Sequence, residues 1–321
     1  MQHTNQTLVP RRAFLSAAAA SLCYCGLQAV NRTHAALAAD SAVLDVAYAG
    51  SMASVMEGPV KAAVSQQLGL EWHGRAQGSN ALARLIVGGN IEPDVFVSIT
   101  PAPMRLVLKS GKAQPALPVA RTEMAIAYSP ESRFAAQFEA SGTPGETAWW
   151  KVLQRPGVRF GRSDPLTDPQ GRNIIFTMQL AARLYREPAL VERVLGPAIN
   201  PRQIFPEPTL LARLQSGELD ATSAYRAQFG NFKLPFLTLP PEINLGDPRF
   251  ASRYATAALS LGGKVYKPEP LVYYATVLRG ARHPAAADRF VRWLTGPQGQ
   301  ALLHRSGYQG ADEVPRLVGG T

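Results

Sequence analysis

Short apolar runs alternate along most of the chain with segments in which apolar residues recur every three or four positions. Runs such as 44–49, 94–98 and 123–128 have the length and composition of buried β-strands. Segments such as 80–87 and 284–295 have the spacing of amphipathic helices. This alternation predicts an α/β fold with mostly parallel sheets.

The same alternation of expected strands and helices continues along the whole chain after its first 40 residues. The expected strands are 44–49, 70–76, 94–98, 123–128, 158–161, 219–224, 235–239, 254–261 and 271–278. The expected helices are 52–68, 80–87, 101–110, 146–154, one that begins at Asp168, 189–195, 209–216, 284–295 and 297–306. Ligands of such folds bind at the carboxyl ends of strands, near helix starts. We therefore expect ligand-binding residues in the strand-to-helix turns.

Two of these turns contain the same pair of residues. Gly50-Ser51 lies in YAGSMAS and Gly78-Ser79 lies in AQGSNALA, each between an expected strand and an expected helix. Glycine lets the backbone approach a ligand closely, and serine adds a hydroxyl donor beside the free N–H groups of the helix start. Each serine could instead simply cap its own helix.

A third helix start follows two Asp-Pro pairs in RSDPLTDPQGRN, residues 162–173. Asp168 is a favoured N-cap, and Pro169 is tolerated in the first turn of a helix. The backbone N–H groups and partial positive charge of such a start can also bind an anion. An ordinary capped helix and an anion site therefore both fit this segment.

The first 38 residues have the features of an export signal. A pair of arginines, Arg11 and Arg12, precedes an Ala-rich apolar run, and Ala36-Leu37-Ala38 offers a cleavage site. The paired arginines followed by Phe and Leu resemble a twin-arginine signal. A membrane anchor and a lipidated Cys23 or Cys25 are the alternatives. We expect a periplasmic protein that is cleaved near Ala38.

Composition narrows the classes of function. The only two cysteines, Cys23 and Cys25, lie in the signal, so the exported chain has no disulfide and no Cys-based metal site. It keeps 30 basic and 23 acidic residues, a net charge of +7 against +10 for the full chain. The basic residues are scattered, which argues against nucleic-acid binding and suits a small anionic ligand.

Familiar catalytic motifs are missing from the sequence. It contains no GxSxG, Walker, HExxH or GxGxxG pattern. The three histidines of the exported chain, His73, His283 and His304, lack metal-ligand spacing and are expected to be surface or packing residues. We therefore expect a binding protein without a cofactor or metal, not an enzyme.

Four stretches carry a resemblance to a known family. They are AGSM at 49–52, QGSNALARLI at 77–86, FGRSDPLTDPQGRN at 160–173 and GELDATSAYRAQFGNFKLPFLTLPPEINLGDP at 217–248. In this order they resemble the periplasmic molybdate/tungstate-binding proteins of ABC importers, which have the type 2 periplasmic-binding-protein fold. The similarity spans roughly residues 43 to 310, and the last two stretches are its more specific part.

The resemblance implies a two-lobed α/β fold with the ligand in the cleft between the lobes. The expected division is 41–121 plus 242–321 for lobe 1 and 122–241 for lobe 2. The implied partners are a small oxyanion, molybdate or tungstate, and an ABC permease in the inner membrane, and we expect a monomer. The implied ligand-binding residues are Ser51 and Ser79 from lobe 1, and Asp168, Gly171, Arg172 and Tyr225 from lobe 2.

Two departures from the family pattern affect the expected coordination. Ala224 stands before Tyr225 where family members have a Glu that coordinates the metal. With one carboxylate missing, we expect a four-coordinate oxyanion held by hydrogen bonds, and Asp168 either contacts it or caps its own helix. Arg172-Asn173 replaces the family's Tyr-Arg, which shifts a guanidinium by one position. Arg162 and Arg226 are alternative anion partners.

Other ligands and an enzyme on the same fold remain alternatives. Sulfate, phosphate and ferric iron are the other candidate solutes. Iron carriers often use paired tyrosines, but Tyr273 and Tyr274 are neighbours in an expected strand and should face opposite sides, one core and one surface. An enzyme would need a convergent acid–base pair, which the sequence does not suggest.

Overall fold

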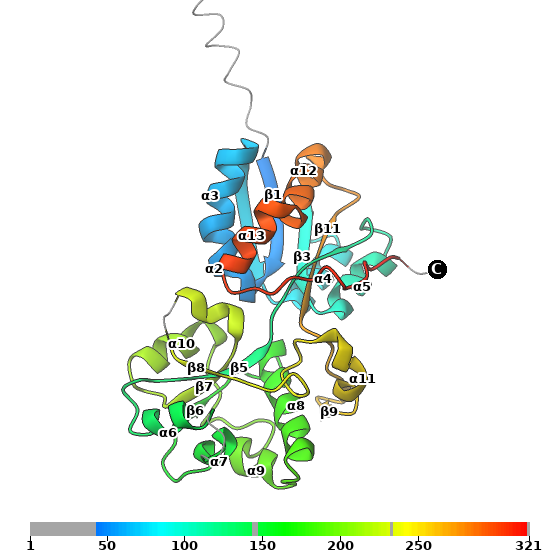
Figure 1. The fold of residues 1–321 in the computed structure, drawn as a ribbon. Helices are drawn as coiled ribbons and strands as arrows, with labels where there is room; N and C mark the ends of the chain where they lie inside the picture. The colour runs from blue at the N-terminus through cyan, green and yellow to red at the C-terminus, as the bar shows by residue number, and fades with distance from the viewer. Residues whose placement is uncertain (1–42, 143–146, 232–233, 320–321) are drawn as a thin grey trace, which may run out of the picture. The chain divides into compact units, whose positions relative to one another are not determined.

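The chain builds two mixed β-sheets with helices on both faces (Figure 1). The structure is a computed structural model that describes residues 43–142, 147–231 and 234–319. The first sheet has the strand order β2-β1-β3-β11-β4. Its strands are β1 (Val43–Ala49), β2 (Glu71–Gln77), β3 (Val95–Ile99), β4 (Leu117–Arg121) and β11 (Val272–Val277).

Helices cover both faces of the first sheet because its inner strands β1, β3 and β11 carry buried side chains on both sides. On one face lie the helical segment 50–68 and α12 (Pro284–Thr295), followed by α13 (Pro297–Arg305). On the other lie α4 (Ser79–Val87) and α5 (Pro101–Lys109). Tyr273 faces the first group and Tyr274 the second, as expected for neighbours in a strand. The expectation that one would be at the surface was wrong, since both are buried.

The helical segment after β1 is less regular than the helix expected over 52–68. It begins as the 3₁₀ turn η1 (Gly50–Met52) and continues through α2 (Ala53–Val55), η2 (Met56–Val60), α3 (Lys61–Ala63) and η3 (Val64–Leu68). Pro59 lies inside it, and Gly58 departs from helical dihedrals. Proline lacks the N–H that an α-helix would use there, so the backbone forms the wider π-type turn η2. A second π-type turn, η3, ends the segment.

The second sheet has the strand order β6-β7-β5-β8. Its strands are β5 (Met124–Tyr128), β6 (Phe160–Gly161), β7 (Ala221–Tyr225) and β8 (Phe236–Thr238). Around it lie α6 (Ala135–Ala140), α7 (Trp149–Leu153), α8 (Pro169–Leu184), α9 (Leu190–Leu195), α10 (Glu207–Gln215) and the 3₁₀ segment η4 (Arg226–Asn231). Helix α8 packs on one face and α10 on the other, which buries β7 completely.

The expected parallel strands occur only in part of each sheet. β1 pairs in parallel with β2 and β3, and β6 pairs in parallel with β7. β11 is antiparallel to β3 and β4, and β5 is antiparallel to β7 and β8. The sheets are therefore mixed rather than mostly parallel. β11 reaches the first sheet after the chain has passed through the second one, and it enters from the opposite end of β3.

Residues 248–266 also differ from the expectation. In place of a long strand over 254–261, the chain forms η5 (Pro248–Phe250), α11 (Ala251–Tyr254) and a hairpin of β9 (Leu259–Leu261) and β10 (Lys264–Tyr266). The hairpin turn is Gly262-Gly263, where φ is 57° and 72°, a conformation that glycine adopts without strain. Gln179 of α8 holds this segment through two hydrogen bonds to Ala258, of 2.9 and 3.1 Å.

Short paired segments connect the two sheets. Met124 N donates to Asn244 O at 2.7 Å, and Leu271 N donates to Leu245 O at 2.8 Å. Leu245 has a φ of 61°, which marks a sharp turn of the backbone here. The buried Glu123 accepts hydrogen bonds from three segments, through the side chains of Asn244, Gln309 and Arg226. The end of the family-like stretch 217–248 is thus part of the connection between the sheets.

The expected export signal, residues 1–38, lies outside the described residues. Within the part of the chain that the structure describes, no helix combines the length and apolar character needed to cross a bilayer.

Candidate functional site

Four of the residues predicted to bind ligand line one small cavity of about 170 Å³. We call it the serine cavity. It is lined by Ala49, Gly50, Ser51, Gly78, Ser79, Ile99, Thr167, Asp168, Pro169 and Tyr225. The first six residues come from the ends of β1, β2 and β3 and the helices that follow them, and the last four come from the second sheet and the start of α8. The cavity therefore lies between residues of the two sheets.

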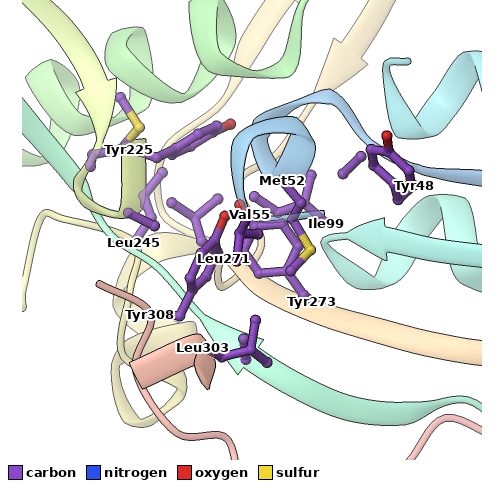
Figure 2. Packing of buried hydrophobic residues seen from close by; sticks show 14 of the residues in the cluster. Tyr48, Met52, Val55, Ile99, Tyr225, Leu245, Leu271, Tyr273, Leu303 and Tyr308 are labelled. Carbon is purple, nitrogen blue, oxygen red and sulfur yellow. The ribbon is translucent and has the colours of Figure 1, made fainter. Parts of the chain in front are cut away.

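Ser51 lies at the end of β1, in the turn η1, and is half-buried. Its Oγ lies 2.9 Å from the hydroxyl of Tyr273 on β11. The hydroxyl of Tyr308, which follows α13, donates to the Ser51 carbonyl oxygen at 3.2 Å. Two tyrosines that are more than 200 residues away in the sequence thus hold this turn, and Figure 2 shows their rings near Met52.

Ser79 is the first residue of α4 and is only 2 % exposed. Its Oγ accepts a hydrogen bond of 3.1 Å from the backbone N–H of Ile99, at the end of the neighbouring strand β3. The N-cap of α4 is Gly78, and no side-chain cap is formed there. Since the Oγ already accepts from the protein, the hydroxyl proton of Ser79 is the group it can offer to a ligand.

Neither serine acts as the simple helix cap that the sequence left open. The side chains of Ser51 and Ser79 form no capping bond to the helix that each one starts. Both serines instead line the cavity, next to Gly50 and Gly78. Each of these turns also brings the N-terminal N–H groups of a helical segment to the same place.

The Asp-Pro segment supplies the opposite wall. Asp164 accepts from Leu166 N at 2.9 Å and so closes the first turn, and its carbonyl oxygen accepts from Asp168 N at 2.8 Å. Asp168 is the N-cap of α8, because its Oδ1 accepts from Gln170 N at 2.7 Å. Asp168 also lines the cavity. The predicted cap of α8 is therefore confirmed, whereas the predicted binding of an anion at this helix start stays a prediction.

Tyr225 ends β7 and completes this wall. Its hydroxyl oxygen accepts a hydrogen bond of 3.0 Å from Asn173 Nδ2 of α8, and both residues are buried. Asn173 stands where the resembling family has an arginine. Because an amide rather than a guanidinium holds the phenol, this contact adds no charge to the cavity.

Two other predicted residues, Gly171 and Arg172, lie behind the cavity wall and are not among its lining residues. A Cβ on Gly171 would lie 2.3 Å from the Ser163 carbonyl oxygen, so this glycine lets α8 pack against the segment 163–165. Arg172 donates to the Pro165 carbonyl at 2.8 Å, and its guanidinium stacks 4.7 Å from the Tyr266 ring centroid. Burial lowers the pKa of Arg172. Both residues shape the loop that carries Asp168.

The other two candidate guanidinium groups are also occupied elsewhere. Arg162 is fully buried and donates to Gln203 and to the carbonyls of 197 and 198. Burial lowers its pKa to about 10. Arg226 pairs with Glu123 at 3.2 Å. Asp168 is thus the only ionisable carboxylate, and no Lys or Arg is present, among the described residues that line the serine cavity.

Three residues that the structure brings to this site are absent from the sequence prediction. Thr167 lines the cavity directly before Asp168, within the motif that had been singled out. Tyr273 and Tyr308 support Ser51 from positions 222 and 257 residues further along the chain. Thr167 could have been predicted, because it is a hydroxyl residue inside the motif. No signal in the neighbouring sequence links the two tyrosines to Ser51.

A larger hollow of about 440 Å³ adjoins the serine cavity and shares Gly50, Ser51 and Gly78 with it. Leu211, Ala227 and Gln228 line it from the second sheet, and Tyr308 and Ser306 line it from the first. None of its described lining residues is charged. We call it the wider cleft, and it leads from the serine cavity along the space between the two sheets.

Comparison with known proteins identifies the family. A family model described as bacterial extracellular solute-binding protein matches residues 44–309. The chain belongs to this solute-binding protein family. The matched range contains both sheets and every residue that lines the serine cavity.

Named relatives of this solute-binding protein agree with the assignment. A solute-binding protein of Petrotoga mobilis is 29 % identical over 269 residues, which cover 82 % of each chain. The molybdate/tungstate-binding protein WtpA of Thermococcus kodakarensis is 32 % identical over 205 residues, which cover 57 % of each chain.

A solved structure shows the same fold. The periplasmic molybdate-binding protein of Azotobacter vinelandii superposes with a TM-score of 0.55 at 18 % identity, covering 83 % of this chain and 98 % of that one. The solute-binding protein therefore has the two-lobed periplasmic-binding-protein fold, as the sequence predicted.

Proposed function

We propose that this solute-binding protein captures molybdate or tungstate in the serine cavity and delivers it to the permease of an ABC transporter. The observation that carries the proposal is the donor set of the cavity. Ser51 and Ser79, which carry hydroxyls, and the start of α8 line one space of about 170 Å³ from both sheets. Helix starts and hydroxyls stabilise negative charge, and this volume is well below the roughly 300–1,000 Å³ of pockets for larger organic ligands.

The named relative supports the choice of anion. The Thermococcus kodakarensis protein is named for molybdate and tungstate, and its similarity covers 57 % of the present chain. Sulfate and phosphate have the same tetrahedral shape and remain alternative ligands. Ferric iron is less favoured, because Tyr273 and Tyr274 face opposite sides of β11 and cannot bind one ion together.

The cavity supports an oxyanion that keeps four-coordinate geometry. The residue before Tyr225 is Ala224, which offers no ligand atom, and Ala224 packs in the core on the other face of β7. Asp168 uses one carboxylate oxygen to cap α8. We infer that hydrogen bonds hold the anion and that Asp168 contributes the wall and the cap rather than a metal ligand.

We also infer how the lobes are divided and how the protein is used. The packing of 248–266 on α8 favours a second lobe of about 122–270, rather than 122–241, with the remaining described residues in the first. A ligand that contacts both lobes would stabilise a closed form, which the permease would recognise. The protein would act as a periplasmic monomer without enzymatic activity or nucleic-acid binding. Residues 1–38 would be its export signal, of the twin-arginine type.

Isothermal titration calorimetry of the exported protein with molybdate, tungstate, sulfate and phosphate tests the proposal. We expect submicromolar binding of molybdate and tungstate, because several charge-assisted hydrogen bonds converge on one dianion. If only sulfate or phosphate gave a heat of binding, molybdate and tungstate would be the wrong ligands. A lack of binding to all four anions would refute the oxyanion site.

A further inference from the structure

We propose that Tyr273 and Tyr308 are positioning residues that aim Ser51 at the bound anion, an inference that rests on the proposed function. Tyr273 acts on the side chain of Ser51, and Tyr308 acts on its main chain. Neither tyrosine is suggested by the sequence motifs, and both are almost fully buried, at 0 % and 4 % exposure.

The hydrogen-bond capacity of Ser51 gives Tyr273 its role. A serine hydroxyl has one proton to donate, and its oxygen can accept from others. The Ser51 and Tyr273 oxygens lie 2.9 Å apart, so one of them donates to the other. When Ser51 uses its proton for an anion, only the phenol can be the donor in this pair. Tyr273 therefore fixes the direction of the Ser51 O–H bond, and a chain of two hydrogen bonds strengthens each of them.

Ser79 shows the same arrangement with a different donor. Its Oγ accepts from the Ile99 backbone N–H, which leaves only its proton for the cavity. An N–H cannot reverse the direction of its hydrogen bond, whereas a phenol can. Ser51 thus depends on a side chain for an arrangement that the backbone enforces at Ser79.

Tyr308 fixes the peptide plane that follows Ser51. Its hydroxyl donates to the Ser51 carbonyl at 3.2 Å, and in a trans peptide this also sets the direction of the Met52 N–H. Burial raises the pKa of Tyr308, so its hydroxyl stays protonated and can donate throughout the neutral range. The Tyr273 and Tyr308 rings pack edge to face, with centroids 5.6 Å apart at 72°.

Figure 2 shows the two rings within the buried cluster that includes Met52 of the same turn and Val55 of α2. Because the rings are packed, removal of a hydroxyl leaves the aromatic ring and its contacts in place. Tyr to Phe variants therefore separate hydrogen bonding from packing.

The test is a double-mutant cycle on molybdate affinity, measured by calorimetry with thermal unfolding of every variant. Tyr273→Phe should weaken binding by about fivefold to tenfold, and it should have less than about a twofold effect when Ser51 is already Ala. Tyr308→Phe should weaken binding by a similar factor in both backgrounds, because it acts on a carbonyl that Ser51→Ala retains. Tyr274→Phe, on the opposite face of β11, is the matched control and should leave affinity unchanged.

The outcomes separate this inference from the proposed function. If Ser51→Ala weakens binding and Tyr273→Phe does not, the role of Tyr273 is refuted while the site stands. If Tyr273→Phe weakens binding equally with and without the Ser51 hydroxyl, it acts through packing and the inference is again refuted. If Ser51→Ala and Ser79→Ala both leave molybdate binding unchanged, the serine cavity is not the site and the proposed function itself fails.

Discussion

The two Gly-Ser turns share the local pattern Gly-Ser-x-Ala but are held in different ways. Ser79 is buried, and a backbone N–H of the adjacent strand holds its hydroxyl. Ser51 is half-buried, and two tyrosine side chains from the last part of the chain hold it. A repeated motif therefore marks where a ligand could bind without showing how firmly each copy is positioned. Ser79 is bonded to the backbone of the sheet, whereas Ser51 relies on side chains from the C-terminal part of the chain.

The largest effect is expected when both turns lose their hydroxyls. Ser51→Ala together with Ser79→Ala should reduce molybdate affinity by roughly 100-fold or more, because two hydrogen bonds to a dianion are lost. Calorimetry with competition against tungstate would measure the change. Ser54→Ala, which alters a residue of the wider cleft but not of the serine cavity, serves as the control. A loss below tenfold would show that the backbone N–H groups alone hold the anion.

Two glycine variants should distinguish a glycine that lines the cavity from one that allows close packing. Gly171→Ala should lower the free energy of unfolding by about 1–3 kcal/mol, because the new Cβ would lie 2.3 Å from the Ser163 carbonyl. Gly78→Ala should leave stability nearly unchanged, since no other atom lies within 4 Å of its Cβ position and φ is −56°. Denaturant unfolding would measure both. Equal losses in the two variants would contradict this distinction.

The single serine variants should differ in stability although both weaken binding. Ser79→Ala leaves the buried Ile99 N–H without its acceptor, so unfolding should become easier by about 1–3 kcal/mol. Ser51→Ala should cost less than about 1 kcal/mol, because water can reach its half-buried position. Thermal and denaturant unfolding without ligand would compare them. The reverse order of stability would show that the tyrosine contacts are the stronger support.

The smallest expected effect is at Asp168, on the wall opposite both turns. Asp168→Asn keeps a good N-cap and removes a negative charge beside the dianion, so molybdate affinity should rise by about threefold to tenfold. Asp164→Asn, which changes a charge in the adjacent turn outside the cavity lining, is the control. A clear loss of affinity in Asp168→Asn would mean that the carboxylate binds the metal, as in six-coordinate family members.

Much of the fold could be predicted because its signals are local. The apolar runs at β1, β3 and β11 and the periodic segments at α4 and α12 are buried on the sides that the pattern indicates. The prediction failed over 254–261, where the apolar spacing also fits a turn of helix followed by a hairpin. It also failed on strand direction, because pairing between distant segments is a property of the chain path and not of any one strand.

The residues that line the cavity were likewise predicted only in part. Ser51, Ser79, Asp168 and Tyr225 share one cavity because each follows a strand or precedes a helix at the facing edges of the two sheets. Gly171 and Arg172 belong to the same motif, but a helix turns its successive residues in different directions, so they pack behind the wall. Whether they influence binding through the Asp168 loop stays a prediction.

The sequence by itself determined most of the elements, the strand-to-helix turns and the motifs that carry hydroxyls at helix starts. Those features depend on neighbouring residues, whose spacing fixes local backbone conformation and amphipathic faces. The tertiary structure alone decided which tyrosines support Ser51, which guanidinium groups are occupied and how residues 248–266 pack on α8. These contacts join residues far apart in the chain, and only the folded backbone brings their polar atoms within hydrogen-bonding distance.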